Sequence, residues 1–284
     1  MKNILSRITL ILVCAGTLSS AEIVHQYQSD MTLPTDIAIL ADGRICVADG
    51  VNARILVFDS RGASTELRFP EMKRPLGLAA DDNGGLLVSD TQAKSVFILD
   101  KYLNLKVNIP LESSVDPTDV LAVGKQLWVV DNDGHQILVI DRKGQLKYTL
   151  GKKGSVGPTF SYPSTISSGK DDQIFVCDVL NGRLQLFNTD FSYQGQIADW
   201  GIIPGQFFRP KGVASQADGR IAVSDSFTGT LQIFKSQSSE GTMIVDSNSN
   251  PLHFQNPTGI AWDKSGLLWV VESATGSVMG VQLP

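Results

Sequence analysis

Six carboxylates recur along the chain, each about fifteen residues after a proline. Such carboxylates, if they face one another, offer oxygen ligands to a hard cation or groups for acid–base catalysis. The alternative is structural, because an Asp that ends a strand accepts hydrogen bonds from the N–H groups of the following loop. We expect the structural role for these six. The pairs are Pro34/Asp49, Pro75/Asp90, Pro117/Asp131, Pro163/Asp178, Pro210/Asp225 and Pro257/Glu272.

The spacing of these pairs indicates a repeat architecture. Successive prolines lie 41, 42, 46, 47 and 47 residues apart, and a period of this size is typical of propellers and solenoids. Each repeat has an apolar run after the proline, a polar turn, a β-branched and aromatic run that ends at the acid, and a third apolar run. The first five repeats add a fourth, more polar run. This composition is that of strands, and it predicts an all-β, six-bladed β-propeller with four antiparallel strands per blade.

The sixth repeat stops after its third run, close to the end of the chain. The segment Glu22–Gln28, "EIVHQYQ", precedes the first proline and has the composition of a strand. We expect this segment to complete the sixth blade and close the ring, because closure removes an open sheet edge.

Two motifs carry a resemblance to a known family. An F-x-x-P motif recurs every 47 residues, and a D-x-x-N-x-R-[IL]-x-x-F motif starts at Asp49 and again at Asp178. Together they resemble the NHL-repeat family, whose members form six-bladed propellers, and the resemblance covers residues 22–284. It implies that Arg54 and Arg183 link strands or neighbouring blades, although an anion contact on a loop face is the alternative. The F-x-x-P motifs are Phe160/Pro163, Phe207/Pro210 and Phe254/Pro257.

The position two residues after each proline departs from the family pattern in three repeats. The family commonly has glycine there, as at Gly77, Gly212 and Gly259, whereas repeats one, three and four have Asp36, Asp119 and Thr165. This position begins the innermost strand, so we expect it near the mouth of the central channel.

Two carboxylates at one opening, Asp36 and Asp119, can bind a hard cation such as Ca²⁺ through oxygen ligands. They can also share acid–base work if one pKa is raised. The structural alternative is that they are solvated or hydrogen-bond a neighbouring loop. Lys211, next to Pro210, would add a cation to the same rim. We expect no tightly bound cofactor, with a divalent cation as the open alternative.

The first 21 residues are typical of a secretory signal peptide. Lys2 and Arg7 precede the apolar run Ile8–Ala15, and Ser19-Ser20-Ala21 supplies small residues before a cut at Glu22. We therefore expect a single domain over residues 22–284, exported to the periplasm or the outside of a bacterial cell. A lipoprotein anchored through Cys14 is disfavoured, because Val13 stands where a small residue is usual.

Charge and composition exclude several partners. Removing Lys2 and Arg7 with the leader lowers the formal charge from −5 to −7, and no basic run is present. A nucleic acid or an anionic membrane surface would require clustered Lys and Arg. After residue 21 no stretch is apolar enough to span a membrane.

Cys46 and Cys177 lie in repeats one and four, opposite each other in a ring of six, so we expect two buried free thiols.

The remaining candidates for chemistry are few. The three histidines, His25, His135 and His253, are irregularly spaced and match no zinc motif. We expect His135 to be an exposed loop residue. We also expect the loop that carries Trp200 to be tucked onto the "PGQF" turn that follows it, with an exposed contact residue as the alternative for Trp200.

The leading functional hypothesis is an exported, non-catalytic propeller that binds a protein or peptide through one loop face, because loops on a rigid scaffold commonly carry function. The alternative is a metal-dependent hydrolase or lyase, gluconolactonase-like or amidating-lyase-like, with its site at the channel mouth. The sequence lacks the E-G-P opening and the matching histidines of those enzymes. The candidate binding residues are Asp36, Asn52, Asp119, His135, Thr165, Asn181 and Lys211.

Overall fold

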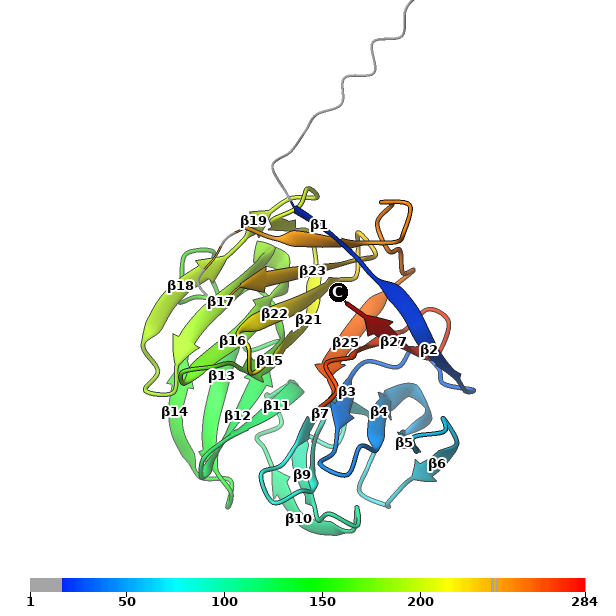
Figure 1. Ribbon diagram of the computed structural model, residues 1–284. Helices are drawn as coiled ribbons and strands as arrows, with labels where there is room; N and C mark the ends of the chain where they lie inside the picture. Colours follow the sequence, from blue (N-terminus) through cyan, green and yellow to red (C-terminus); the bar gives the residue numbers. More distant parts are fainter. Residues whose placement is uncertain (1–16, 236–237, 239, 284) are drawn as a thin grey trace, which may run out of the picture.

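The computed structural model describes residues 17–235, 238 and 240–283. These residues form six sheets of four or five strands, arranged in a ring (Figure 1). Each proline–acid repeat supplies most of one sheet, so the predicted six-bladed β-propeller is confirmed. Blades are numbered here by their repeats, one to six. Among the described residues, no helix is long and apolar enough to cross a bilayer.

Within each blade the strands follow one another from the central channel outward. The innermost strands are β3 (Ile37–Ile39), β7 (Pro75–Ala80), β11 (Pro117–Val123), β15 (Pro163–Ser168), β21 (Pro210–Ser215) and β25 (Pro257–Trp262). The second strands are β4 (Ile45–Asp49), β8 (Leu86–Asp90), β12 (Gln126–Asp131), β16 (Gln173–Asp178), β22 (Arg220–Asp225) and β26 (Leu268–Glu272). The third strands are β5 (Arg54–Phe58), β9 (Ser95–Leu99), β13 (Gln136–Asp141), β17 (Arg183–Asn188), β23 (Thr230–Lys235) and β27 (Ser277–Gln282).

The outermost strands of the first five blades are β6 (Ser64–Leu67), β10 (Leu105–Pro110), β14 (Leu146–Leu150), β18 (Tyr193–Ile197) and β24 (Thr242–Val245). Two short 3-10 helices, η1 (Gly50–Asn52) and η2 (Val179–Asn181), follow the second strands of blades one and four. A small parallel pair, β19 (Asp199–Trp200) and β20 (Gln206–Phe207), lies between blades four and five.

The sixth blade is completed by the N-terminal segment. Strand β2 (Glu22–Gln28) pairs antiparallel with β27 (Figure 1, blue beside red), as the sequence predicts. Residues Thr17–Ser20, which belong to the expected leader, form a further strand, β1, parallel to β24. The positive start and the whole apolar run of that leader lie outside the described residues. The cleavage and the export therefore stay predictions.

The proline–acid spacing has a simple origin in the inner hairpin. In five blades the proline and the acid are direct cross-strand partners, as Pro75 and Asp90 are, and the register shifts immediately after the proline. Such a bulge bends the strand and re-aims the next side chains. The residues one and two positions after each proline consequently occupy the channel and its mouth.

The hydrophobic core is divided into six clusters, one at each interface between neighbouring blades. Cys46 lies in the cluster between blades one and two, and Cys177 lies in the cluster between blades four and five. Both thiols are free and fully buried, as expected from their positions in the repeats. Burial raises the pKa of each thiol to about 12, which leaves both groups as unreactive thiols near neutral pH.

Candidate functional site

The six repeated acids hold the loops that precede the prolines. Asp90 accepts hydrogen bonds from the N–H groups of Lys73 and Arg74, and also from Gln92 and Ala93 in the loop that follows. The other five acids likewise accept an N–H from a residue one to three positions before their own blade's proline. All six carboxylates are buried. The ring of acids is thus occupied by backbone contacts, which is the structural role expected of it.

Arg54 and Arg183 are buried partners of these acids. Arg183 donates to Asp178 (2.8 Å), to Gln196 Oε1 (2.8 Å) and to the carbonyl of Thr159 (2.8 Å). Arg54 makes the equivalent bond to Asp49 (2.7 Å) and adds ion pairs to other carboxylates of blade one and the segment before it. Burial would lower the pKa of Arg54, but the hydrogen bonds that its guanidinium donates to Asp49, Asp30 and Glu66 raise it. Both guanidinium groups therefore brace single blades.

Asp36 and Asp119 connect one blade to the next through their carboxylates. Asp36 Oδ2 in blade one accepts the N–H of Leu78 in blade two at 2.8 Å. Asp119 Oδ2 in blade three accepts the N–H of Ile166 in blade four at 2.8 Å, and its Oδ1 accepts the N–H of Val120 at 2.7 Å. These bonds lock the rotamers of two buried side chains, which is the preorganisation that a binding or catalytic group needs.

Glycines of the preceding blades make room for these two residues. A Cβ on Gly77 would come within 2.5 Å of the Asp119 Cα, and one on Gly259 would come within 2.4 Å of Asp36 Oδ1. Contacts this short do not occur between real atoms, so glycine is required at both positions. Where a blade has Asp two residues after its proline, the preceding blade therefore has glycine at the same position, because the two residues pack against each other.

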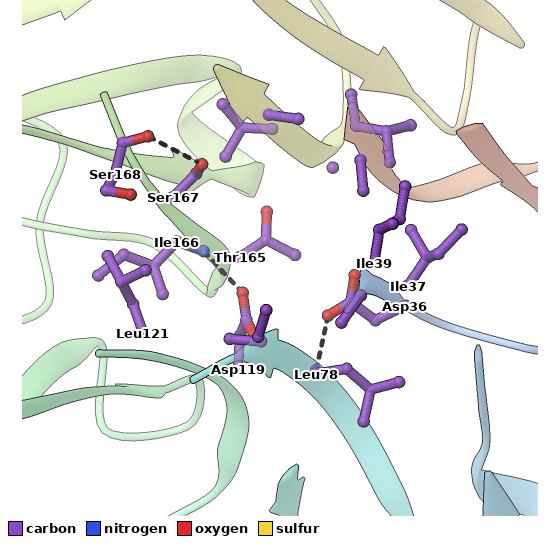
Figure 2. A pocket seen from close by; sticks show the side chains of 18 of the residues that line it. Asp36, Ile37, Ile39, Leu78, Asp119, Leu121, Thr165, Ile166, Ser167 and Ser168 are labelled. Atoms are coloured by element: carbon purple, nitrogen blue, oxygen red, sulfur yellow. Dashed lines mark hydrogen bonds between the residues drawn. The ribbon is translucent and has the colours of Figure 1, made fainter. Parts of the chain in front are cut away.

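The side chains of Asp36, Asp119 and Thr165 converge on one cavity of about 310 Å³ in the central channel, called here the channel cavity (Figure 2). Its walls are the inner strands, including Ile39 of blade one and Trp262 of blade six. Thr165 donates its hydroxyl to the carbonyl of Lys211 at 2.7 Å. The structure thus brings together the three residues that depart from glycine.

Both carboxyl groups of the channel cavity are held toward their neutral forms. Burial raises the pKa of Asp36 to about 7, although the Leu78 and Ile37 N–H groups oppose the shift. The pKa of Asp119 is raised well above its usual value by burial and, in addition, by the charge of Asp36. Two interacting carboxyls of this kind titrate as a pair, and they can exchange protons with a ligand near neutral pH.

The donor set does not suit a protein-built metal centre. Among the residues that the structure describes, no three His, Cys, Asp or Glu side chains lie close enough to hold a cation. Asp36 and Asp119 also already accept backbone N–H groups. A hard cation prefers several charged oxygen ligands, and the channel cavity brings together two carboxyl groups.

A second cavity, of about 350 Å³ and called here the mouth cavity, lies on the side of the channel where the prolines stand. Asp36 and Thr165 line both cavities, and Lys211 lines only the mouth cavity. Arg74, which the sequence did not mark as a candidate, also lines it. Lys211 therefore joins the predicted rim, as its position next to Pro210 suggested.

The other predicted binding residues, Asn52, Asn181 and His135, lie outside both cavities and form hydrogen bonds to neighbouring residues of the protein. Asn52 donates to Asp49 at 2.9 Å, and Asn181 donates to Asp178 at 2.8 Å. The prediction that His135 is exposed is wrong: its side chain is buried, and its Nδ1 accepts the N–H of Tyr162 at 2.9 Å. The Tyr162 ring covers it edge-on, which excludes the imidazole from solvent.

Sequence reasoning missed an exposed apolar patch on the loops of blades four and five. The loop that carries Trp200 is tucked onto the "PGQF" turn as expected, since Asp199 and Trp200 pair with Gln206 and Phe207, but 60% of the Trp200 surface is exposed. Its ring contacts Phe208 (centroids 4.9 Å apart), which stacks on the exposed Phe227 at 4.0 Å. Ile202, two residues after Trp200, is also exposed. These four residues, Trp200, Ile202, Phe208 and Phe227, are called here the aromatic patch; a run of apolar residues in loops was the signal for it.

Comparison with known proteins agrees with this architecture. The NHL repeat model matches residues 31–58, which contain Asp36, Asp49 and Arg54 of blade one. The chain carries an NHL repeat. None of the curated proteins matches it.

Solved structures with the same fold cover almost the whole chain. A streptogramin B lyase is 15% identical with a TM-score of 0.68, covering 93% of this chain and 98% of its own. A gluconolactonase from Xanthomonas campestris is 13% identical, with a TM-score of 0.70 and coverages of 94% and 97%. The PQQ-bound aldose sugar dehydrogenase from Streptomyces coelicolor is 14% identical, with a TM-score of 0.67 and coverages of 94% and 98%. At these identities the likeness is one of fold, and the neighbours of this NHL-repeat propeller are propeller enzymes.

Proposed function

We propose that the protein binds a small polar molecule in the channel cavity and exchanges protons with it through Asp36 and Asp119. The observation that carries this proposal is the convergence of two buried carboxyl groups, from blades one and three, on one cavity. Cavities of this size that combine apolar walls with a few polar groups are typical ligand sites. The inter-blade hydrogen bonds fix both carboxyls in place before a ligand arrives.

The environments of the two carboxyls assign them different roles. Burial raises the pKa of Asp119 well above its usual value and repulsion from Asp36 raises it further, so we assign Asp119 the role of the general acid. Burial raises the pKa of Asp36 to about 7, so Asp36 is partly ionised and acts as the general base. Pairs of carboxyls with separated pKa values are a recurrent solution for acid–base chemistry near neutrality.

This pairing supports hydrolysis of a lactone or ester, or an elimination. In the first case the base takes a proton from the attacking water, and the acid returns one to the leaving oxygen. In the second case the base takes a proton from carbon instead. Enzymes named as a lyase and as a gluconolactonase share this fold, so the scaffold accommodates chemistry of both classes.

The test begins with the titration of the two carboxyls. Carbon-13 spectra of labelled protein, assigned with Asp36→Asn and Asp119→Asn, are expected to show one carboxyl with a midpoint about 7. If both carboxyls titrate below pH 5, the acid–base role is lost.

The second step measures hydrolysis of a series of aliphatic lactones. Asp36→Asn is expected to lower kcat by about 10²-fold or more, the range of general acid–base catalysis, with little change in KM. The control is Asp133→Asn, at an exposed loop position, which should leave kcat unchanged. Equal loss in the control and in Asp36→Asn would contradict the assignment.

The aromatic patch favours a second candidate function, the docking of a protein or peptide segment. Exposed tryptophan and phenylalanine rings that contact one another are typical of interface centres. Arg209, beside Phe208, is exposed, and so are Lys152 and Lys153, in the loop whose Gly154 carbonyl is held by Asn181. The occupant we propose is therefore an acidic segment with apolar side chains.

A fluorescent peptide that alternates Leu and Glu is the appropriate probe for this patch. Binding should weaken at least tenfold in Trp200→Ser, and also at high salt, because both the apolar and the charged contacts contribute. Exposed Tyr102, in blade two, supplies the matched control, Tyr102→Ser. Unchanged binding in Trp200→Ser would rule out the patch as the docking site.

A further inference from the structure

Four of the six residues directly after the prolines carry a hydroxyl that donates to a carbonyl of the next blade at the channel mouth; these residues, Thr35, Thr118, Ser164 and Thr258, are called here the threonine ring. Thr35 Oγ1 donates to the Leu76 carbonyl of the next blade at 2.7 Å. The same link joins Thr118 to Ser164 at 3.0 Å and Ser164 to Lys211 at 3.3 Å. These hydroxyl protons are committed to carbonyls. Toward the mouth cavity the oxygens therefore offer lone pairs, which accept hydrogen bonds from a ligand.

Lys211 and Leu76 are the two residues directly after a repeated proline that lack a hydroxyl, and Lys211 carries a charge. It occupies the position that carries a hydroxyl in four other blades, at Thr35, Thr118, Ser164 and Thr258. Among the described residues, its ammonium group has no hydrogen bond and no ion pair, although the side chain lines the mouth cavity. Burying part of an ammonium group without a partner costs free energy of folding. The Lys211 side chain therefore either binds a ligand or lowers the stability of the protein.

The mouth cavity carries an excess of positive charge. Arg74, from blade two, is also without an ion pair among the described residues and lines the same cavity. Asp116, the other acid that lines this cavity among the described residues besides Asp36, is paired with Lys94 at 3.2 Å and accepts a hydrogen bond from the Thr91 hydroxyl. Asp36 is held toward its neutral form by burial, which raises its pKa. On a chain with a formal charge of −5, this local excess favours an anionic ligand.

The direction of the pKa shift of Lys211 agrees with an anionic ligand in the mouth cavity. Burial lowers the pKa of the ammonium group, and the nearby charge of Arg209 lowers it further, against an opposite effect of Cys177. A bound anion would compensate all of these costs, because it supplies the missing opposite charge inside a partly desolvated site.

We infer that the mouth cavity binds a small hydroxycarboxylate, whose carboxylate is held by Lys211 and Arg74 and whose hydroxyls donate to the oxygens of the threonine ring. This inference rests on the proposed function, because such a ligand would extend from the mouth cavity to the Asp36 carboxyl that lines both cavities. It names the substrate class: a hydroxylated carboxylate, or its ester or lactone.

Binding is tested with two probes that have the same hydroxylated carbon chain and differ in charge. D-gluconate should bind in calorimetry, whereas the neutral D-glucitol should show at least tenfold weaker binding. Acetate, which has the charge without the hydroxyls, should also bind at least tenfold more weakly than gluconate. Equal affinity for gluconate and glucitol would overturn the anion site, and equal affinity for gluconate and acetate would overturn the role of the threonine ring.

Two variants of Lys211 keep the test independent of folding. Lys211→Met preserves the length of the side chain, and Lys211→Thr introduces the residue that blades one, three and six have at this position. Both should weaken gluconate binding at least tenfold while circular dichroism stays that of the wild type. Lys170→Met, at an exposed lysine of blade four, is the control. Wild-type affinity in both Lys211 variants, or no gluconate binding to the wild type, would overturn the inference.

Different results would contradict the anion site and the acid–base proposal. Asp36→Asn keeps both cations, so gluconate binding should persist even where lactone hydrolysis is lost. If gluconate binds through Lys211 while both channel carboxyls titrate below pH 5, the anion site stands and the catalytic proposal does not. If the carboxyls titrate as expected and no variant changes gluconate binding, the reverse holds.

Discussion

The carboxylate of Asp36 in blade one accepts the backbone N–H of Leu78 in blade two, in the wall of the central channel. The same carboxyl is fully buried against Gly259 of blade six. One side chain therefore touches three consecutive blades at the point where the N-terminal and C-terminal parts of the ring meet. This position explains both its raised pKa and its suitability as a fixed functional group.

Asp36 should make the stability of the fold depend on pH between about 4 and 7. Its pKa in the folded state is raised to about 7 from 3.8, so in this window the native state binds a proton that the unfolded state has released. The free energy of unfolding must then fall as the pH rises, because ionising the buried carboxyl costs free energy.

Asp36→Asn should therefore flatten this part of the curve. The difference from the wild type should grow to a few kcal/mol at pH 8, since one pKa unit corresponds to about 1.4 kcal/mol. Urea unfolding at several pH values measures it, with Asp133→Asn as the control. A wild type that becomes more stable between pH 4 and 7, relative to Asp36→Asn, would contradict the sign.

Gly77→Ala should destabilise the interface between blades two and three. The new Cβ would lie 2.5 Å from both the Asp119 Cα and the Thr118 carbonyl oxygen, which are backbone atoms that cannot swing away. Overpacking of this kind typically costs about 1–3 kcal/mol. Thr165→Ala, at the equivalent position of blade four, is the matched comparison. It loses one hydrogen bond, a cost of about 1 kcal/mol. Denaturant unfolding that ranks the two variants in the opposite order would argue against the packing relationship.

Arg183→Met should cost on the order of 3 kcal/mol, because it leaves the buried Asp178 carboxylate without its opposite charge. Arg61→Met removes an ion pair to Asp59 in which the arginine side chain is 84% exposed. That loss should stay below about 1 kcal/mol. Thermal unfolding of the two variants separates the contributions, and equal midpoints would show that Arg183 does not brace blade four.

Closure of the ring should depend on strand β2. A chain that begins at Glu22 keeps the pairing of β2 with β27 and the contact of Tyr27 with Trp269 (centroids 5.1 Å apart). A chain that begins at Ser29 loses both and exposes an edge of the sixth blade. We expect the first chain to unfold cooperatively like the full protein and the second to be much less stable. Comparable melting temperatures would disprove the closure.

The thiols offer a test of burial and of the expected leader together. Because the pKa of Cys46 and Cys177 is raised to about 12 by burial, a disulfide reagent at pH 8 should react with neither in the native state. Protein recovered from the cell envelope should show two thiols once it is unfolded in guanidinium. Three thiols would mean that Cys14 is retained, and rapid reaction of the native protein would contradict the burial.

The period of the prolines and acids was enough to predict the number of blades, the order of strands and the closing segment. These features depend on hairpins, in which partners such as Pro75 and Asp90 are close in sequence. The departures at Asp36 and Asp119 were visible for the same reason, since a repeat makes its exceptions conspicuous. The burial of His135 was not predicted, because it depends on a neighbouring loop, the one that contains Tyr162.

The sequence by itself therefore determined the propeller and pointed to the positions after each proline. Only the tertiary structure decided what those positions touch. Asp36 meets Leu78, 42 residues away, and Asp119 meets Ile166, 47 residues away. Among the residues that the structure describes, it also left Lys211 in the mouth cavity without an ion pair. Local propensity sets the hairpin within a blade, whereas burial, charge and pKa in the channel arise from side chains that different blades bring together when the ring closes.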